Sequence, residues 1–410
     1  MSLHTRFKLF IIIIFLLVST ISFPQDNYST QNANNSSIPL LEIEDTEAND
    51  EKVLDLGYKI RDAILEEDVE KFMLHIDYDS FGKLVTKDID EDGDTKAFKN
   101  GFLKGLKSGI KSLPQKIIKE VNAGGYYDFV NFYYSESNKT YFMLFRFYSP
   151  ITGINYHDYE VSISNNTFTF KDIYIYLSGE DLSQTFRRFY MYNLPKKSLL
   201  NFFGEDNAKE FDKVVNAVYL YNRGDFLEAY NKFKEIKGHL STDKFILIIK
   251  AACASNINDE EYKIAMETIA KKYPDDSSIY LTQLDYHLLN ANYETALKLV
   301  DRLQVDTSDD FLNLLKGNIE YNKLNYDKAL EHFKYISDNY PDFFEGHSSY
   351  LTMLALKEEF ENCITFLTFL VDEGYNKTDL IEFIEEPDEN GENNLNNLAE
   401  SELYKKWKNT

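Results

Sequence analysis

The feature that most constrains this chain is a pattern that returns about every 34 residues in its C-terminal half. Each copy has an aromatic residue, a small residue three positions later and a bulky apolar residue four positions after that. The copies are Phe226–Ala229–Phe233, Tyr262–Ala265–Ile269, Tyr293–Ala296–Val300, Tyr326–Ala329–Phe333 and Phe360–Cys363–Leu367. Their small residues lie 36, 31, 33 and 34 positions apart. Such a period indicates stacked helical units, none of which can bury its apolar face alone.

The fourth copy shows why small residues recur. It lies in the stretch LKGNIEYNKLNYDKALEHFKYISDNYP, which reads as two helices around a short turn. Gly317 stands nine positions before Tyr326, and Pro341 stands eight positions after Phe333. A glycine inside a helix costs about 1 kcal/mol relative to alanine. Gly317 and Ala329 therefore predict a point where the two helices approach closely.

The period and the order of small residue, tyrosine, alanine, phenylalanine and proline resemble the tetratricopeptide repeat family. The resemblance covers residues 207–378 and implies about five helical hairpins whose inner helices line a concave surface for a peptide or protein partner. The copies depart from the family in two ways. None has its tryptophan, although Tyr280 takes that place in the third copy. At the glycine offset the other copies carry Ala217, Cys253, Leu284 and Leu351.

The family register also implies which side chains face a partner. They are Tyr221, Asn222, Asp285, Asn318, Tyr321 and Asn322. Tyrosine offers a large aromatic area, and asparagine offers amide groups for an extended backbone. None of the six is basic, so the family's clamp for a terminal carboxylate is not expected. The alternative is that the tyrosines pack against neighbouring helices.

The part before the repeats has a different pattern. Residues 52–193 begin with helical periodicity, as at Val53, Leu56, Ile60 and Ile64. Four segments rich in aromatic and β-branched residues follow, separated by turn sequences, and then another helical segment. This order predicts an α+β domain with helices first and an antiparallel sheet second. It resembles the NTF2-like and cystatin-like folds, in which a curved sheet wraps a long helix.

The whole chain is thus expected to be an α+β domain followed by an all-α, tetratricopeptide-like solenoid at residues 205–378. Residues 379–410 are expected to form a helical cap. This C-terminal segment carries the apolar residues Leu395, Leu398, Leu403 and Trp407. A stack of repeats needs such an element because its last apolar face would otherwise meet water.

Two positions in the sheet region could carry ligand chemistry. Arg146 and His157 would hold a small anionic ligand if the sheet curves around a pocket, and His157 could also act as a general base. The alternative is a hydrogen-bonded position on an exposed face. Alternation places His157 on the face opposite Asp158 and Glu160.

No metal or cofactor is expected. Asp88, Asp90 and Asp92 match the first half of a calcium loop. Lys99 occupies the last ligand position, where a glutamate is needed, so a solvated acidic turn is the better interpretation. Cys253 and Cys363 belong to no paired motif and are expected to be small, partly buried thiols with no bond between them.

The first 25 residues have the pattern of a signal peptide. Arg6 and Lys8 precede the apolar run from Leu9 to Val18, which is short for a membrane span. An uncleaved anchor is the alternative. Residues 26–51 are polar and acidic and are expected to be a disordered linker. The formal net charge of −24 argues against nucleic acid as a partner.

These observations favour an exported bacterial protein, periplasmic or secreted, that is not inserted in a membrane after cleavage. We expect a non-enzymatic adaptor or scaffold that binds a protein or peptide segment. One alternative is a ligand-binding or catalytic NTF2-like domain with accessory repeats. Another is a structural spacer in an envelope assembly. The sequence does not define an oligomeric state.

Overall fold

The computed structural model describes residues 42–87, 93–150, 152–274, 276, 279–387 and 393–410, and side chains 93–94 and 196–208 are left aside. The chain divides into two compact units, and the boundary lies between Tyr286 and His287. The boundary falls within a helix of the region expected to form the repeats, so the residues from 205 to 286 of that region belong to the same unit as the sheet.

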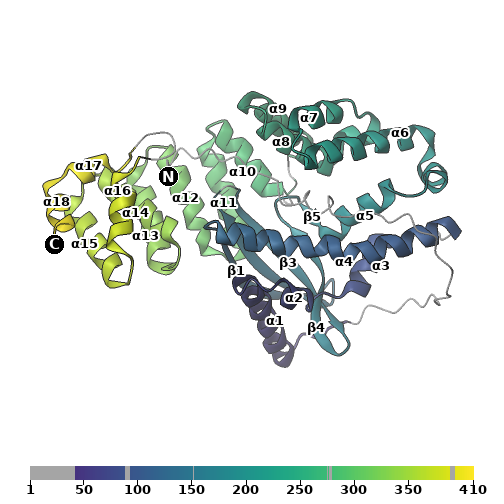
Figure 1. Ribbon diagram of the computed structural model, residues 1–410, viewed down its shortest axis with the longest axis horizontal. Helices are drawn as coiled ribbons and strands as arrows, with labels where there is room; N and C mark the ends of the chain where they lie inside the picture. The colour runs from purple at the N-terminus through teal and green to yellow at the C-terminus, as the bar shows by residue number, and fades with distance from the viewer. Residues whose placement is uncertain (1–41, 88–92, 151, 275, 277–278, 388–392) are drawn as a thin grey trace. The chain divides into compact units, whose positions relative to one another are not determined.

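The first unit begins with helices and continues with a sheet (Figure 1). The helices are α1 (Glu47–Leu65), α2 (Val69–Met73), α3 (Tyr78–Thr86) and α4 (Gly93–Asn122). The strands are β1 (Tyr126–Ser135), β2 (Thr140–Ser149), β3 (Gly153–Ser164), β4 (Thr167–Ile175) and β5 (Glu180–Asp181), and α5 (Leu182–Tyr192) follows them. Neighbours in sequence pair antiparallel in the order β1-β2-β3-β4-β5. The prediction of helices followed by an antiparallel sheet is confirmed.

The first domain begins earlier than residue 52. Ile43 is 2% exposed, and its N–H donates to the carbonyl of Lys139 at 2.9 Å. Thr46 then caps α1 through its side chain, which accepts from the N–H of Asn49. The acidic composition of this segment suggested a linker, but one buried isoleucine and a helix cap anchor its last part to the sheet domain.

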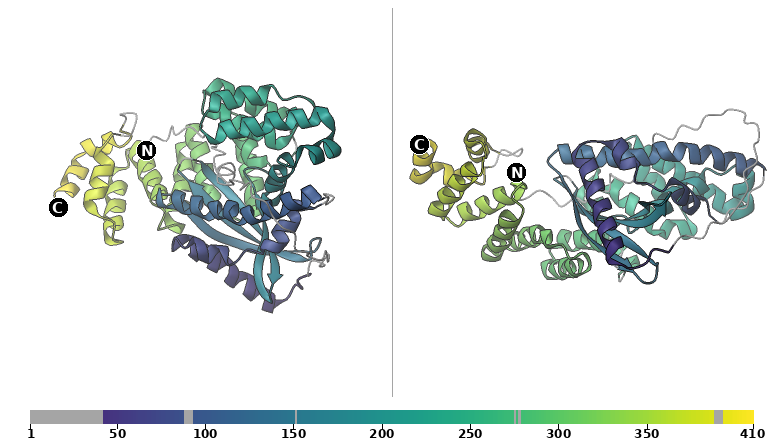
Figure 2. Two further views of the ribbon diagram at one scale, coloured as in Figure 1. Left: turned by 45° about the vertical axis from the view of Figure 1, so that its right-hand side comes forward. Right: turned by 90° about the horizontal axis from the view of Figure 1, so that it is seen from below.

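One face of the sheet is covered by helices. α1 and α4 both contact β1 and β2, and α1 crosses the strands in the view from below (Figure 2). On the same face Phe72 of α2 makes edge contacts with Tyr159 and Phe170, with ring centres 6.4 and 5.7 Å away. Tyr159 is itself fully buried. The aromatic richness of the strands thus forms the core between sheet and helices.

The rest of the described chain is helical. The first unit adds α6 (Lys196–Asn222), α7 (Phe226–Lys234), η2 (Gly238–Thr242), α8 (Lys244–Ser255) and α9 (Asp259–Lys272). α10 (Tyr280–Leu289) spans the boundary. The second unit continues with α11 (Tyr293–Thr307), η4 (Asp310–Leu312), α12 (Asn313–Asn322), α13 (Tyr326–Asn339), α14 (Phe344–Leu356), α15 (Phe360–Asp372), α16 (Lys377–Glu385), α17 (Asn396–Glu400) and α18 (Glu402–Lys408).

Within each unit, successive helices pack against one another. In the first, α6 contacts α7, α7 contacts α8 and α8 contacts α9. In the second, the contacts run in the same way from α11 to α15. Three-residue turns join α12 to α13 and α14 to α15, so each of these pairs is an antiparallel hairpin.

The small residues of the repeated pattern are buried. Ala229, Ala296, Ala329 and Cys363 are 0% exposed and Ala265 is 4% exposed. A Cβ atom added at Gly317 would lie 2.7 Å from the ring of Phe333 in the facing helix. The close approach predicted from the glycine is therefore confirmed, and the group that makes it is the bulky residue of the same copy.

The hairpin turns share one backbone geometry. Ala291, Leu324 and Glu358 have φ of 54°, 62° and 58°, and Gly224 takes the same place in the α6–α7 turn with φ of 81°. In the α12–α13 turn, the N–H groups of residues 324 and 325 donate to the carbonyls of residues 321 and 320, both at 2.9 Å. This is the Schellman pattern that ends a helix in the left-handed conformation. Its recurrence gives the hairpins a common turn.

The C-terminal helices bury apolar side chains against the last hairpin. Leu395, Leu398 and Trp407 belong to the same buried cluster as Leu370 of α15, whereas Leu403 is 37% exposed. Three of the four apolar residues expected to cap the repeats are thus buried. Among the described residues, none of the helices combines the length and apolar character that a membrane span requires.

Candidate functional site

The two expected ligand-binding residues of the sheet point to opposite faces. His157 pairs with Phe145 across β2 and β3, whereas Arg146 pairs with Tyr156. Because successive residues of a strand alternate between faces, the two side chains are separated by the sheet itself. The pocket expected to contain both is therefore not formed, and the sequence missed this because register depends on how the turns close.

His157 lies in the core between sheet and helices. It is 0% exposed, and its Nε2 lies 3.2 Å from the amide nitrogen of Asn155. The Tyr127 hydroxyl lies 3.5 Å from its Nδ1 and 2.7 Å from the Tyr159 hydroxyl. Burial lowers the pKa of His157 to about 3, so the ring is neutral near pH 7. His157 is a hydrogen-bonded core residue.

Arg146 lies on the other face, where several charged groups are buried. It is 3% exposed, with its guanidinium 3.7 Å from a carboxylate oxygen of Asp128. Asp158 and Asp172, 5% and 4% exposed, lie farther along this face. The Tyr133 hydroxyl donates to Asp158 at 2.7 Å. This face thus combines buried charged groups with side chains that reach solvent, such as Tyr133.

Burial also shifts the pKa values of the carboxylic acids on this face. It raises the pKa of Asp158 to about 6 and that of Asp172 to about 7, against opposing hydrogen bonds from Tyr133 and Ser183 respectively. Asp172 was not anticipated. In the sequence it is marked only as an acidic residue within the strand-like segment KDIYIY. The strand pairing then places it opposite Glu160.

The three expected partner-binding residues of the first unit are largely enclosed. Tyr221 is 5% exposed and packs edge-on against Phe226, with ring centres 5.5 Å apart. Asp285 is 0% exposed and accepts a hydrogen bond from the Tyr262 hydroxyl. Only Asn222 is half-buried. Tyr221 and Asp285 are thus held by contacts with neighbouring helices, as the packing alternative foresaw for the tyrosines.

The three expected residues of the second unit are more accessible. Asn318, Tyr321 and Asn322 are all half-buried and lie on α12. The amide nitrogen of Asn322 donates to the carbonyl of Asn318 at 2.9 Å, which fixes its orientation. Tyr321 lies beside Tyr326 at 5.8 Å between ring centres. These three side chains form the α12 surface, where every expected residue retains access to solvent.

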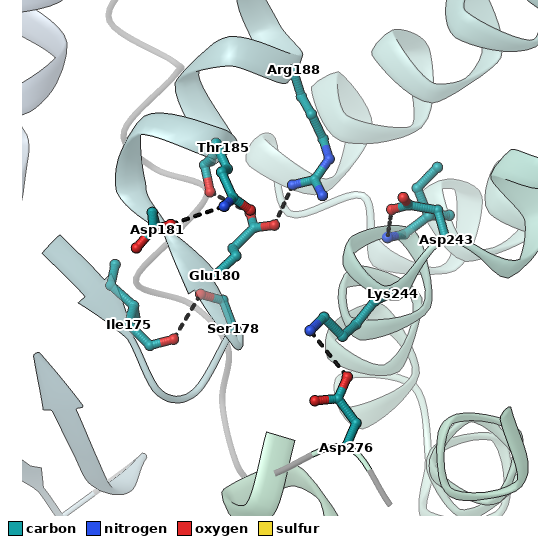
Figure 3. A network of polar contacts seen from close by, with 11 residues as sticks. Ile175, Ser178, Glu180, Asp181, Thr185, Arg188, Asp243, Lys244 and Asp276 are labelled. Carbon is teal, nitrogen blue, oxygen red and sulfur yellow. Dashed lines mark hydrogen bonds and ion pairs between the residues drawn. The ribbon is translucent and has the colours of Figure 1, made fainter. Parts of the chain in front are cut away.

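A polar network fastens the sheet to the first helical hairpins within the first unit (Figure 3). Glu180 is 4% exposed and forms an ion pair with Arg188 of α5. Thr185 donates a second hydrogen bond to Glu180 at 2.5 Å. Arg188 also covers the ring of Phe245 in α8, 4.4 Å from its centre. Burial raises the pKa of Glu180, and the Arg188 charge opposes this shift.

The other residues singled out in the sequence are the aspartates of the calcium-like loop and the two cysteines. Asp88, Asp90 and Asp92 lie outside the described residues. Among those that are described, no group of three or more His, Cys, Asp or Glu side chains is arranged to hold a metal ion. Cys253 and Cys363 form no disulfide, as expected, and both are more fully buried than expected. Burial raises the pKa of the Cys363 thiol to about 12.

No family model matches the chain, and no solved structure matches it. An uncharacterized protein of Borreliella burgdorferi is 25% identical over 154 residues, which are 36% of this chain and 44% of that protein. The match thus spans less than half the length of that curated relative and attaches no activity to either chain.

Proposed function

We propose that this chain is an exported, non-enzymatic interaction protein whose helical hairpins stack as tetratricopeptide-like repeats and hold a segment of a partner protein. The observation that carries the proposal is the recurrence of one packing unit. Small buried residues return at the repeat spacing, and the turns at Gly224, Ala291, Leu324 and Glu358 share one backbone conformation. Such units gain stability by stacking and present extended surfaces to other molecules.

The α12 surface is the part that we propose to contact the partner. Asn318 and Asn322 offer side-chain amides, and Tyr321 offers aromatic area beside them. These groups suit an extended backbone, which presents alternating donors and acceptors. The first unit would serve as the mount, because Arg188 ties its sheet domain to the first hairpins.

The alternative of a ligand-binding or catalytic N-terminal domain has less support. It needed Arg146 and His157 in one pocket, and they point to opposite faces of the sheet. We also propose export, on the strength of the apolar run that follows Arg6 and Lys8. Sequencing the N-terminus of the protein recovered from culture medium and cell fractions tests it, and an intact leader in the cytoplasmic fraction would argue against it.

Site-specific photo-crosslinking tests the partner surface. A photo-reactive amino acid in place of Asn322 should capture a discrete partner in the source cells. The same group in place of Val305, 79% exposed on α11, is the control and should capture none. The experiment is decisive when combined with Tyr321→Ala, which should abolish the crosslink. Equal capture at both positions, or a crosslink indifferent to Tyr321, would refute the proposed surface.

A further inference from the structure

A cleft of about 430 Å³ lies beside the C-terminal ends of α13 and α15 and the start of α14. Phe369 and Tyr375 form an aromatic side of it, and Phe369 is 48% exposed. The carboxylates of Asp338, Asp342 and Glu373 lie around it. No lysine or arginine is among its described lining residues. We call this site the C-terminal cleft.

The electrostatic character of the C-terminal cleft is negative. Asp342 and Glu373 are exposed and form no ion pair with the described residues. Asp338 pairs with Lys334 at 2.6 Å, but both side chains are more than half exposed, so solvent screens that pair. α13 ends at Asn339 and α15 at Asp372, and helix C-termini carry partial negative charge. Carboxylates and helix ends therefore both favour a cation.

The inner wall of the cleft is rigid and uncharged. His347 is 2% exposed, and its Nε2 donates to the carbonyl of Pro341 at 2.9 Å. Its Nδ1 is left to accept from the Ser337 hydroxyl at 2.8 Å. The Tyr375 hydroxyl also donates to the Pro341 carbonyl, at 3.0 Å. Burial lowers the pKa of His347, so this wall adds no positive charge that would repel a cation.

We propose that the C-terminal cleft binds an arginine side chain presented by a protein segment. The guanidinium would lie between the carboxylates of Asp342 and Glu373, and its planar face and alkyl stem would lie against Phe369 and Tyr375. Arginine fits this combination better than lysine, because its planar group stacks on aromatic rings and pairs with carboxylates through two hydrogen bonds. The inference rests on the proposed function only in taking the occupant to be a protein segment, since its residues are distinct from the α12 surface.

The direct test uses two peptides and the full chain. The acetylated and amidated peptide Gly-Leu-Arg-Leu-Gly is titrated calorimetrically at low salt, beside the same peptide with neutral citrulline for arginine. We expect the arginine peptide to bind at least about tenfold more tightly and to weaken as sodium chloride is added. Equal affinities, or binding that salt does not weaken, would overturn the inference.

Matched variants locate the binding. Asp342→Asn combined with Glu373→Gln should lower affinity for the arginine peptide about tenfold. Glu331→Gln with Glu361→Gln removes two exposed charges from α13 and α15, away from the lining of the cleft, and should leave it unchanged. An equal loss in both pairs would reduce the effect to net charge and overturn the site. Binding of spermidine or Ca²⁺ without binding of the peptide would also overturn it.

The two proposals fail separately. Tyr321→Ala should leave peptide binding at the C-terminal cleft unchanged, and the Asp342→Asn, Glu373→Gln pair should leave the crosslink from position 322 in place. If only the crosslinking experiment fails, the proposed partner surface is refuted and the cleft stands. If only the peptide titration fails, the cleft is refuted as an arginine site and the partner surface stands.

Discussion

His157 in the sheet and His347 in the hairpins are both buried and neutral, yet their surroundings differ. Around His157 the partners are aromatic and amide side chains of the same core, with no opening. His347 is held as firmly, but one side of its neighbourhood is a solvent-filled cleft with carboxylates around it. A polar residue in a core thus serves the fold, whereas binding potential depends on which groups stay open to solvent.

The first unit, which contains the sheet, should lose the most stability when a buried charge is removed. Arg188→Met leaves Glu180 buried without its cation, which typically costs about 3–5 kcal/mol. Hydrogen exchange of peptides from β4, α5 and α8 measures the loss, and Lys83→Met on the exposed side of α3 is the control. Adding Glu180→Gln to Arg188→Met should restore much of the stability. No recovery would show that the stacking of Arg188 on Phe245 dominates.

A pH series sharpens the same contrast. The pKa of Asp172 is about 7 in the folded protein and about 4 when unfolded, so between these values only the folded state holds the proton. Asp172 therefore lowers stability by about 1.4 kcal/mol per unit of rising pH in that window. In urea unfolding, the free energy of unfolding of Asp172→Asn should increase relative to that of the parent chain as pH rises through this window, by up to about 1.4 kcal/mol per pH unit. Parallel curves for the two would contradict the assignment.

The parent curve alone is not diagnostic, since His157 acts in the opposite sense. Its pKa falls from about 6.5 unfolded to about 3 folded, so the unfolded state binds the extra proton between these values. Its contribution to stability is therefore lost as pH falls through that range. Only the difference between Asp172→Asn and the parent chain isolates the aspartate.

The second unit should lose the most stability when side-chain volume is added at a buried position between its helices. Ala329→Leu adds bulk where no exposed surface remains and should cost about 1–3 kcal/mol. The single tryptophan, Trp407, lies in this unit, so its fluorescence during denaturation reports the loss. Lys328→Leu, exposed on the same helix, should change stability little. A similar loss in both would count against the close helix crossing.

The smallest expected effect comes from the turns. Leu324 is 71% exposed with φ of 62°, so Leu324→Gly relieves backbone strain without losing packing. A gain of about 0.5–1 kcal/mol is expected, and Trp407 fluorescence measures it. Val305→Gly, at an exposed helical position, should instead lose about 0.4 kcal/mol. Gains at both positions would point to the unfolded state as the cause.

The sequence predicted packing better than it predicted access. Gly317 and Ala329 mark a close contact because backbone sterics act locally, and the strands followed from aromatic alternation. The site residues fared differently. Tyr221 and Asp285 are buried by helices whose placement no local pattern defines, and the faces of Arg146 and His157 depend on strand register. The C-terminal cleft combines residues from three helices, so only the folded hairpins bring Asp338, Asp342 and Glu373 together.

The buried cluster at the end of the chain carries a consequence for biosynthesis. Leu398, Tyr404 and Trp407 complete a core begun by α15 and α16, and they leave the ribosome after both of these helices. Until then the apolar face of α15 and α16 remains exposed to solvent and can associate with other chains. A nascent chain that stalls after residue 385 should therefore aggregate or be degraded, whereas a chain that has folded residues 395–407 onto this core should not.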